Sequence, residues 1–77
     1  MARRNIVGGR VKLAREKAIP RITQKDLTAR LQLEGLLIER ATISKIETGY
    51  RDVNDVEIAA IAKSLGVTIG WLFGEES

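Results

Sequence analysis

Polar and cationic side chains recur at helical spacing between Ile38 and Arg51. Ile38, Ile43 and Ile46 form one apolar stripe, with Ala41 near its edge. The opposite face carries a hydrogen-bonding set: Arg40, Thr42, Ser44, Lys45 and Thr48. These side chains are short or cationic, so they can approach base edges and donate to them. We therefore predict a helix, Arg40–Thr48, that lies in the major groove of DNA.

Residues on both sides of this segment are suited to bind phosphate. Gly49 allows a left-handed helix end, and Tyr50 and Arg51 follow it in a loop from which they could reach an anion. Gln24 and Lys25 fall in the first turn of an earlier predicted helix, where free backbone amides favour a phosphate. The sequence thus predicts phosphate contacts from two separate segments.

Catalytic and metal-binding chemistry is not predicted. The 77 residues include no cysteine and no histidine, which removes the thiolate ligand and the commonest general base. The carboxylates of Asp26, Glu34, Glu39 and Glu47 are explained by helix caps and ion pairs. We therefore expect no enzyme activity, no cofactor and no bound metal.

Length and charge favour a single nucleic-acid-binding domain over residues 1–77. No apolar run approaches the roughly 20 residues of a membrane span, and the N-terminus has no signal-peptide core. Residues 1–25 hold eight Lys/Arg and one acidic residue, a net +7, whereas residues 52–77 hold one lysine and five acidic residues, a net −4. The basic end should be attracted to a polyanion. We expect a cytoplasmic, nucleoid-associated protein that binds double-stranded DNA and no membrane.

Apolar periodicity and cap residues predict five helices and no strand, which make a compact all-α bundle. With their caps, the helices cover residues 6–17, 23–33, 39–48, 54–65 and 68–73. Thr23, Asn54 and Thr68 are favourable N-caps, whereas Glu39 is a weaker one. Each of these caps is flanked by an apolar pair that can staple the first turn of its helix.

The N-terminal region allows alternatives. Gly8 and Gly9 weaken the first helix, so they indicate either close packing or a later helix start. Residues 1–5 are predicted to form a flexible basic arm with Arg3 and Arg4. The arm either contacts the DNA backbone or minor groove, or remains a solvated tail.

The segment Glu34–Glu39 is irregular, since Gly35 ends the preceding helix. Leu37 and Ile38 are too apolar for an exposed turn, so both are expected to pack against the core. Near the C-terminus, three apolar side chains are predicted to be core or dimer contacts rather than a base-stacking platform: Trp71, Leu72 and Phe73.

Four motifs together resemble the lambda-repressor-like, Cro/XRE family of helix-turn-helix DNA-binding domains. They are RVKLAR at 10–15, TQKDL at 23–27, TISKIETG at 42–49 and IAAIAKSLGVTIGWL at 58–72. The resemblance covers nearly the whole chain. It implies that the second and third helices form the DNA-binding unit, with the third helix in the major groove.

Carried over by position, the resemblance implies roles for individual residues. The base-reading candidates are Arg40, Ala41, Ser44 and Lys45. The DNA-backbone candidates are Gln24, Thr42, Tyr50 and Arg51, and Lys25 joins them from its place in the first turn. Arg15 and Glu47 match positions that form an internal ion pair. The chain departs from the family in its lengthened turn, which affects the angle of the reading helix.

The leading hypothesis is a small sequence-specific transcriptional regulator, a repressor that binds a near-palindromic operator as a homodimer. The competing hypothesis is a protein-interaction adaptor or antitoxin-type subunit that uses the same fold with a second protein partner. The size suits phage Cro-like repressors, restriction–modification controllers and compact antitoxins, and the sequence does not separate these.

Overall fold

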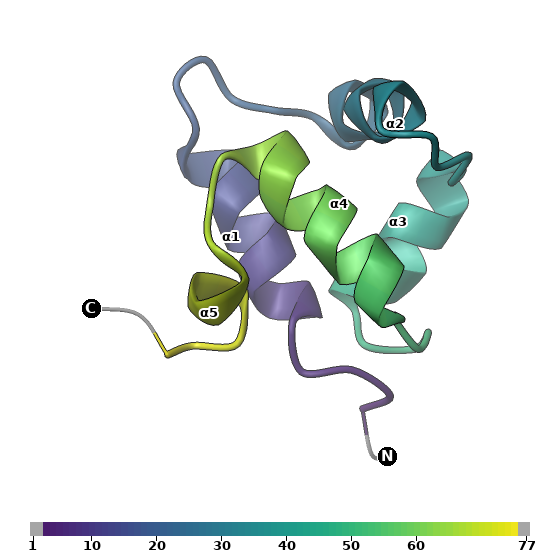
Figure 1. The fold of residues 1–77 in the computed structure, drawn as a ribbon, viewed down its shortest axis with the longest axis vertical. Coiled ribbons are helices and arrows are strands. Elements are labelled where there is room, and N and C mark those ends of the chain that lie inside the picture. Colours follow the sequence, from purple (N-terminus) through teal and green to yellow (C-terminus); the bar gives the residue numbers. More distant parts are fainter. Residues whose placement is uncertain (1–2, 76–77) are drawn as a thin grey trace.

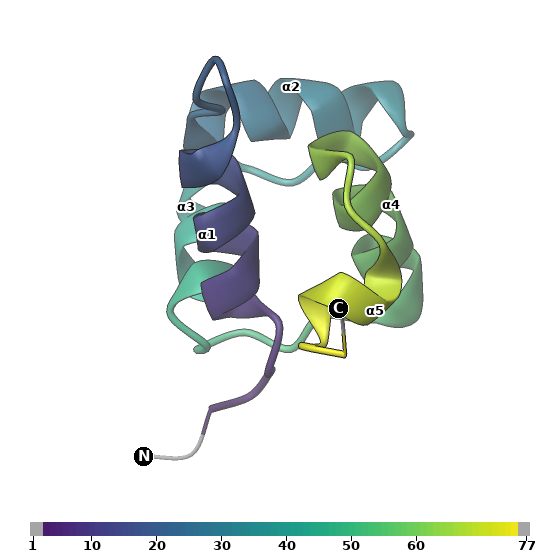
Figure 2. The same ribbon diagram turned by 90° about the vertical axis from the view of Figure 1, so that its left-hand side faces the viewer.

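The computed structural model describes residues 3–75, which contain five α-helices and no strand. The helices are α1 (Gly8–Lys17), α2 (Gln24–Leu33), α3 (Arg40–Glu47), α4 (Asp55–Leu65) and α5 (Ile69–Leu72). α1 and α3 pack side by side, α2 crosses one end of the molecule, and α4 lies opposite (Figure 1 and Figure 2). The all-α, five-helix prediction is confirmed.

Side-chain caps define where three of the helices begin. The Thr23 hydroxyl accepts from the Asp26 amide at 3.0 Å, and the Asp26 carboxylate accepts from the Thr23 amide at 3.0 Å. Asn54 and Glu57 form the same reciprocal box at the start of α4. The Thr68 hydroxyl accepts from the backbone amide at the third position of α5. These caps satisfy amides that have no partner within their own helix.

The start of α1 is set by its contact with α3. α1 begins at Gly8, two residues later than the predicted Ile6. A Cβ at Gly8 would collide with the carbonyl oxygen of Ile46, so a glycine is required where the two helices approach. The Asn5 side-chain oxygen accepts from the amides of Val7 and Gly8 at 3.1 and 2.7 Å. Close packing and a late helix start therefore occur together.

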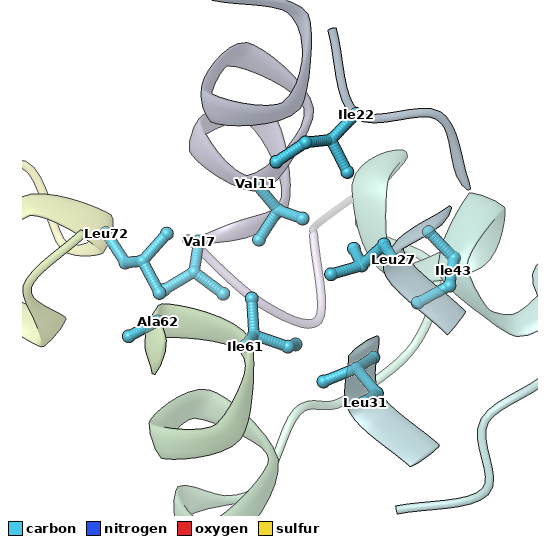
Figure 3. Packing of buried hydrophobic residues seen from close by; sticks show 9 residues of the cluster. All are labelled: Val7, Val11, Ile22, Leu27, Leu31, Ile43, Ile61, Ala62 and Leu72. Atoms are coloured by element: carbon cyan, nitrogen blue, oxygen red, sulfur yellow. The ribbon is translucent and has the colours of Figure 1, made fainter. Parts of the chain in front are cut away.

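The core lies where all five helices meet. Its members come from every helix and from the segment before α2 (Figure 3): Val7, Val11, Ile22, Leu27, Leu31, Ile43, Ile61, Ala62 and Leu72. The apolar partners of the predicted staples lie in or against this cluster, so the same residues that begin each helix also pack the bundle.

The turn between α2 and α3 corrects one prediction and confirms another. Ile38 packs against the core as expected, together with Leu36. Leu37 is 84% exposed, so its predicted burial is wrong. The segment is irregular rather than helical, and its half-buried neighbours Leu36 and Ile38 occupy the core side while Leu37 stays in solvent. Glu39 occupies the N-cap position of α3 but makes no side-chain cap hydrogen bond.

Residues 3–5 are anchored rather than extended into solvent as a free arm. The Arg4 amide donates to the Gly49 carbonyl at 2.8 Å. The Asn5 side-chain amide donates to the carbonyls of Ile46 and Arg51 at 3.0 and 2.8 Å. Residues 4 and 5 thus hydrogen-bond to the end of α3 and to the loop that follows it. Residues 1 and 2 of the predicted arm lie outside the described residues.

Candidate nucleic-acid interface

α3 presents a polar face because the core takes up its apolar side chains. Ile43 and Ile46 are completely buried. The exposed side chains of the helix and its C-cap are Arg40, Ala41, Lys45 and Thr48. Thr42 and Ser44 are half-buried. Three of the four residues predicted to read bases thus share one exposed surface, and Ser44 lies less accessibly on the same helix.

A buried ion pair joins α3 to α1 beneath this face. Arg15 Nε and Nη2 lie 2.6 and 2.9 Å from the two carboxylate oxygens of Glu47. Arg15 also donates to the Ile22 carbonyl at 3.1 Å, ahead of α2. The hydrogen bonds from Arg15 to Glu47 raise the pKa of Arg15, although burial opposes this. The pair expected from the family resemblance is present, and it fastens three segments together.

Gln24 connects the ion pair to the surface of α3. Its side-chain nitrogen donates to Glu47 Oε1 at 3.1 Å. Its side-chain oxygen accepts from the Ser44 hydroxyl at 3.3 Å. Both hydrogen bonds cross from α2 to α3, so they hold the first turn of α2 against the C-terminal half of α3.

The N-terminus of α2 opens into a cationic hollow of about 570 Å³. Its lining residues are Arg15, Arg21, Thr23, Gln24, Lys25 and Arg40. Of the cations, Arg15 is paired inside the protein and Arg21 pairs with Glu16 at 3.2 Å. Lys25 and Arg40 are exposed and come from the first turns of α2 and α3. The amide end of α2 adds partial positive charge, which favours an anion.

Asp26 places a negative charge in the same turn of α2. Hydrogen bonds from the backbone amide and the hydroxyl of Thr23 hold the pKa of Asp26 below its usual value. Its carboxylate is therefore engaged in the cap. This leaves Lys25 as the exposed cation of the first turn.

The loop after α3 is held by a second ion pair. Arg51 Nη1 and Nη2 lie 3.0 and 2.8 Å from the two carboxylate oxygens of Glu57. The Arg51 hydrogen bond is the main cause that lowers the pKa of Glu57, which also caps Asn54. The guanidinium of Arg51, which was predicted to contact the DNA backbone, thus donates two hydrogen bonds to a carboxylate within the protein. Tyr50 beside it is 62% exposed.

Asn5 and Glu57 are site-supporting residues that the sequence prediction did not assign to the interface. The Asn5 side chain accepts from amides at the start of α1 and donates to a carbonyl at the end of α3. Glu57 follows the predicted N-cap Asn54 by three residues, the spacing of a capping box, but it was not predicted as the partner of Arg51. Asparagine directly before a predicted helix is a usable capping signal. The contacts of Asn5 to the end of α3 and its loop are long-range, and no local pattern indicates them.

The helix-turn-helix family matches residues 12–72, a span that includes α2, α3 and the ion pair beneath them. The chain belongs to this family. The match supports the Cro-type, lambda-repressor-like assignment made from the sequence. No curated protein and no solved structure matches the chain. The family match supports a general function for this chain, that of a DNA-binding helix-turn-helix regulator.

This helix-turn-helix domain has an extended connection between its two central helices. α2 ends at Leu33 and α3 begins at Arg40. The connecting residues 34–39 exceed the three or four of a typical helix-turn-helix. The Gln24 hydrogen bonds to Glu47 and Ser44 nevertheless hold α2 against α3.

The C-terminal helix of the domain divides the three predicted core or dimer contacts between the core and the surface. Leu72 is completely buried in the core, so it cannot contact a second chain in this fold. Trp71 packs against the core and lies under Arg10, whose guanidinium carbon is 4.0 Å from the ring centroid. Arg10 Nε also donates to the Trp71 carbonyl at 2.7 Å. Phe73 alone of the three is exposed, at 40%.

Residues 3–75 contain neither a metal-binding cluster nor a membrane-spanning helix. No three acidic, histidine or cysteine side chains of this part of the chain gather into a group that could hold a metal ion. None of the helices there is long and apolar enough to cross a membrane.

Proposed function

We propose that this helix-turn-helix protein is a small sequence-specific transcriptional repressor. It binds a near-palindromic operator as a homodimer and places α3 in the major groove. The observation that carries the proposal is the exposed set Arg40, Ala41 and Lys45 on α3, next to the cationic N-terminus of α2. We call these three side chains, with Ser44 at their edge, the reading face.

Each member of the reading face suits a different part of the major groove. Arg40 and Lys45 carry donors that match O6 and N7 of guanine, and Ala41 can contact a thymine methyl group. Ser44 donates to Gln24, so it is only partly available to a base. Arg40 and Lys45 are therefore expected to contribute most of the discrimination.

Phosphate contacts would position this face on the duplex. Lys25 and the N-terminus of α2 form one contact, and Gln24 supports them through the buried network. Thr42 and Tyr50 line a second hollow together with Lys45 and Arg51. Phosphate contacts at both hollows would fix the depth and register of α3 in the groove.

We infer dimerisation from the small DNA contact area that one domain of this size can form. A single module of this kind buries only about 600–1,000 Å² on DNA. Two copies bound to half-sites about 34–36 Å apart would double the contact area and require an inverted repeat. Phe73 remains the candidate for the dimer contact among the predicted residues, since Leu72 is buried.

Selection of bound sequences from a random duplex pool at near-physiological salt tests this function. Recovery of an inverted repeat with one fixed half-site spacing is the expected result. Recovery of a single unrepeated motif would retain the reading face but contradict the homodimer. Recovery of no sequence above background, from protein shown to be helical by circular dichroism, would favour the adaptor or partner-subunit hypothesis.

A further inference from the structure

The turn between α2 and α3 shares a surface with the reading face. Residues 36–39 line a hollow of about 570 Å³ together with side chains of α2, including Lys25, and with Arg40. Lys25 and Arg40 also line the hollow at the N-terminus of α2. The two hollows therefore have the same two exposed cations on their common border. The turn lies beside the surface to which we assign DNA.

Leu37 is the side chain that this turn presents to solvent. It is 84% exposed, whereas Leu36 and Ile38 on either side are half-buried against the core. These two half-buried neighbours pack against the core, and the side chain between them remains in solvent. Leu37 also lines the same hollow as Lys25 and Arg40, so an exposed apolar side chain and two cations share one surface.

Hydrogen bonds hold both ends of the turn. The Leu36 amide donates to the Leu31 carbonyl at 2.9 Å. The Glu39 carbonyl accepts from the amides of Thr42 and Ile43 at 2.9 and 3.1 Å. The backbone on each side of Leu37 is thus already ordered. A side chain on such a backbone can form a contact with little further loss of conformational entropy.

We propose that Leu37 contacts a thymine methyl group and extends the base-reading surface beyond α3. The inference rests on the proposed function. Thymine displays its methyl group in the major groove, and an exposed leucine is an apolar complement to it. Lys25 and Arg40 border the same hollow and would attract the surrounding phosphates or bases. No polar group on Leu37 competes for a hydrogen bond.

The position of this thymine is limited by chain length. Leu37 precedes Arg40 by three residues, which span at most about 10 Å when extended. Successive base pairs are about 3.4 Å apart along the helix axis. The thymine is therefore expected within about three base pairs of the base contacted by Arg40, in both half-sites.

Removing the methyl group from DNA and the leucine from the protein tests the contact directly. Deoxyuridine keeps the hydrogen-bonding edge of thymine but lacks its methyl group. On the operator recovered by selection, each thymine near the Arg40 base is replaced in turn by deoxyuridine. One such replacement should weaken wild-type binding about fourfold per half-site, the value of one buried methyl-sized group. Leu37→Ala should weaken binding to the thymine operator at least as much and show no additional weakening with deoxyuridine.

Leu33→Ala is the matched control. Leu33 is a leucine of similar exposure, 87%, at the end of α2, and it does not line the hollow beside Arg40. This variant should bind like wild type and keep the full response to deoxyuridine. Equal loss of affinity in the Leu33 and Leu37 variants would contradict a specific contact by Leu37.

The outcomes separate this inference from the function on which it rests. Sequence-specific binding with a deoxyuridine response that persists in Leu37→Ala would overturn the Leu37 contact, and the reading face would stand. Sequence-specific binding with no deoxyuridine response at any of these thymines would overturn it in the same way. Failure of folded wild-type protein to select any sequence would overturn the proposed function first and the Leu37 contact with it.

Discussion

Arg40 is the residue on which base recognition depends most directly. It is exposed in the first turn of α3, where a helix in the major groove meets base edges. Arg40→Ala should cost about 1–3 kcal/mol on the selected operator and little on random DNA. Fluorescence anisotropy titrations with both duplexes measure this difference.

The control for this prediction removes an equal charge elsewhere. Lys12→Ala deletes an exposed cation of α1 outside the two hollows that flank the reading face. It should change operator and random-DNA affinity alike, and only slightly. If Arg40→Ala behaved in the same way, Arg40 would not be a base contact.

Glu47 is expected to act through stability. Its carboxylate accepts two hydrogen bonds from Arg15 and one from Gln24. Glu47→Ala would leave a buried guanidinium without its charge partner, which costs about 3–5 kcal/mol of unfolding free energy. Chemical denaturation followed by circular dichroism measures this decrease. Glu16→Ala, which removes a surface pair with Arg21, should cost at most about 1 kcal/mol. Equal effects of the two substitutions would rule out a stabilising role for the buried pair.

At the scale of elements, the packing of α1 on α3 depends on one glycine. Gly8→Ala would place a Cβ against the Ile46 carbonyl, so the helices must separate. We expect a decrease in stability of about 1–3 kcal/mol, as for other overpacked sites. Gly9→Ala meets no atom within 4 Å and replaces a helical glycine. It should stabilise the domain by about 0.5–1 kcal/mol.

Thermal unfolding of the two glycine variants gives opposite expected shifts from the same chemical change. A lower melting temperature for Gly8→Ala with a higher one for Gly9→Ala would support the close helix contact. Stabilisation by both substitutions would mean that α1 does not approach α3 as closely as this packing requires.

Most elements were predictable because their end signals are local. Thr23 with Asp26 and Asn54 with Glu57 are reciprocal caps that involve residues only three apart, and both boxes form. The start of α1 was less predictable because it depends on Ile46, which is remote from Gly8 in the chain. The burial of Leu37 was predicted from its apolarity alone, whereas in the folded turn Leu36 and Ile38 pack on the core and Leu37 stays exposed.

At the scale of the whole molecule, the uneven distribution of charge makes DNA binding dependent on salt. Binding weakens with a slope of about −0.9 in log affinity against log salt for each phosphate contacted. Lys25→Ala should make the slope shallower by about 1.8 for a bound homodimer, because the variant would neutralise one phosphate fewer in each of its two domains. Lys63→Ala removes a cation of α4 that pairs with Glu34, and it should leave the slope unchanged. Titrations at several salt concentrations measure both slopes. A slope unaffected by Lys25→Ala would exclude this phosphate contact.

Periodicity, caps and motifs were sufficient to determine from the sequence the all-α class, the family and the identity of α3 as the exposed polar helix. These features depend on neighbours within one or two helical turns. Only the tertiary structure decided which side chains remain available to contact a ligand. Arg51 is engaged by Glu57, Ser44 by Gln24, and Leu72 by the core, while Leu37 is left exposed. These outcomes depend on how the turns and helices pack in three dimensions, and no local pattern encodes them.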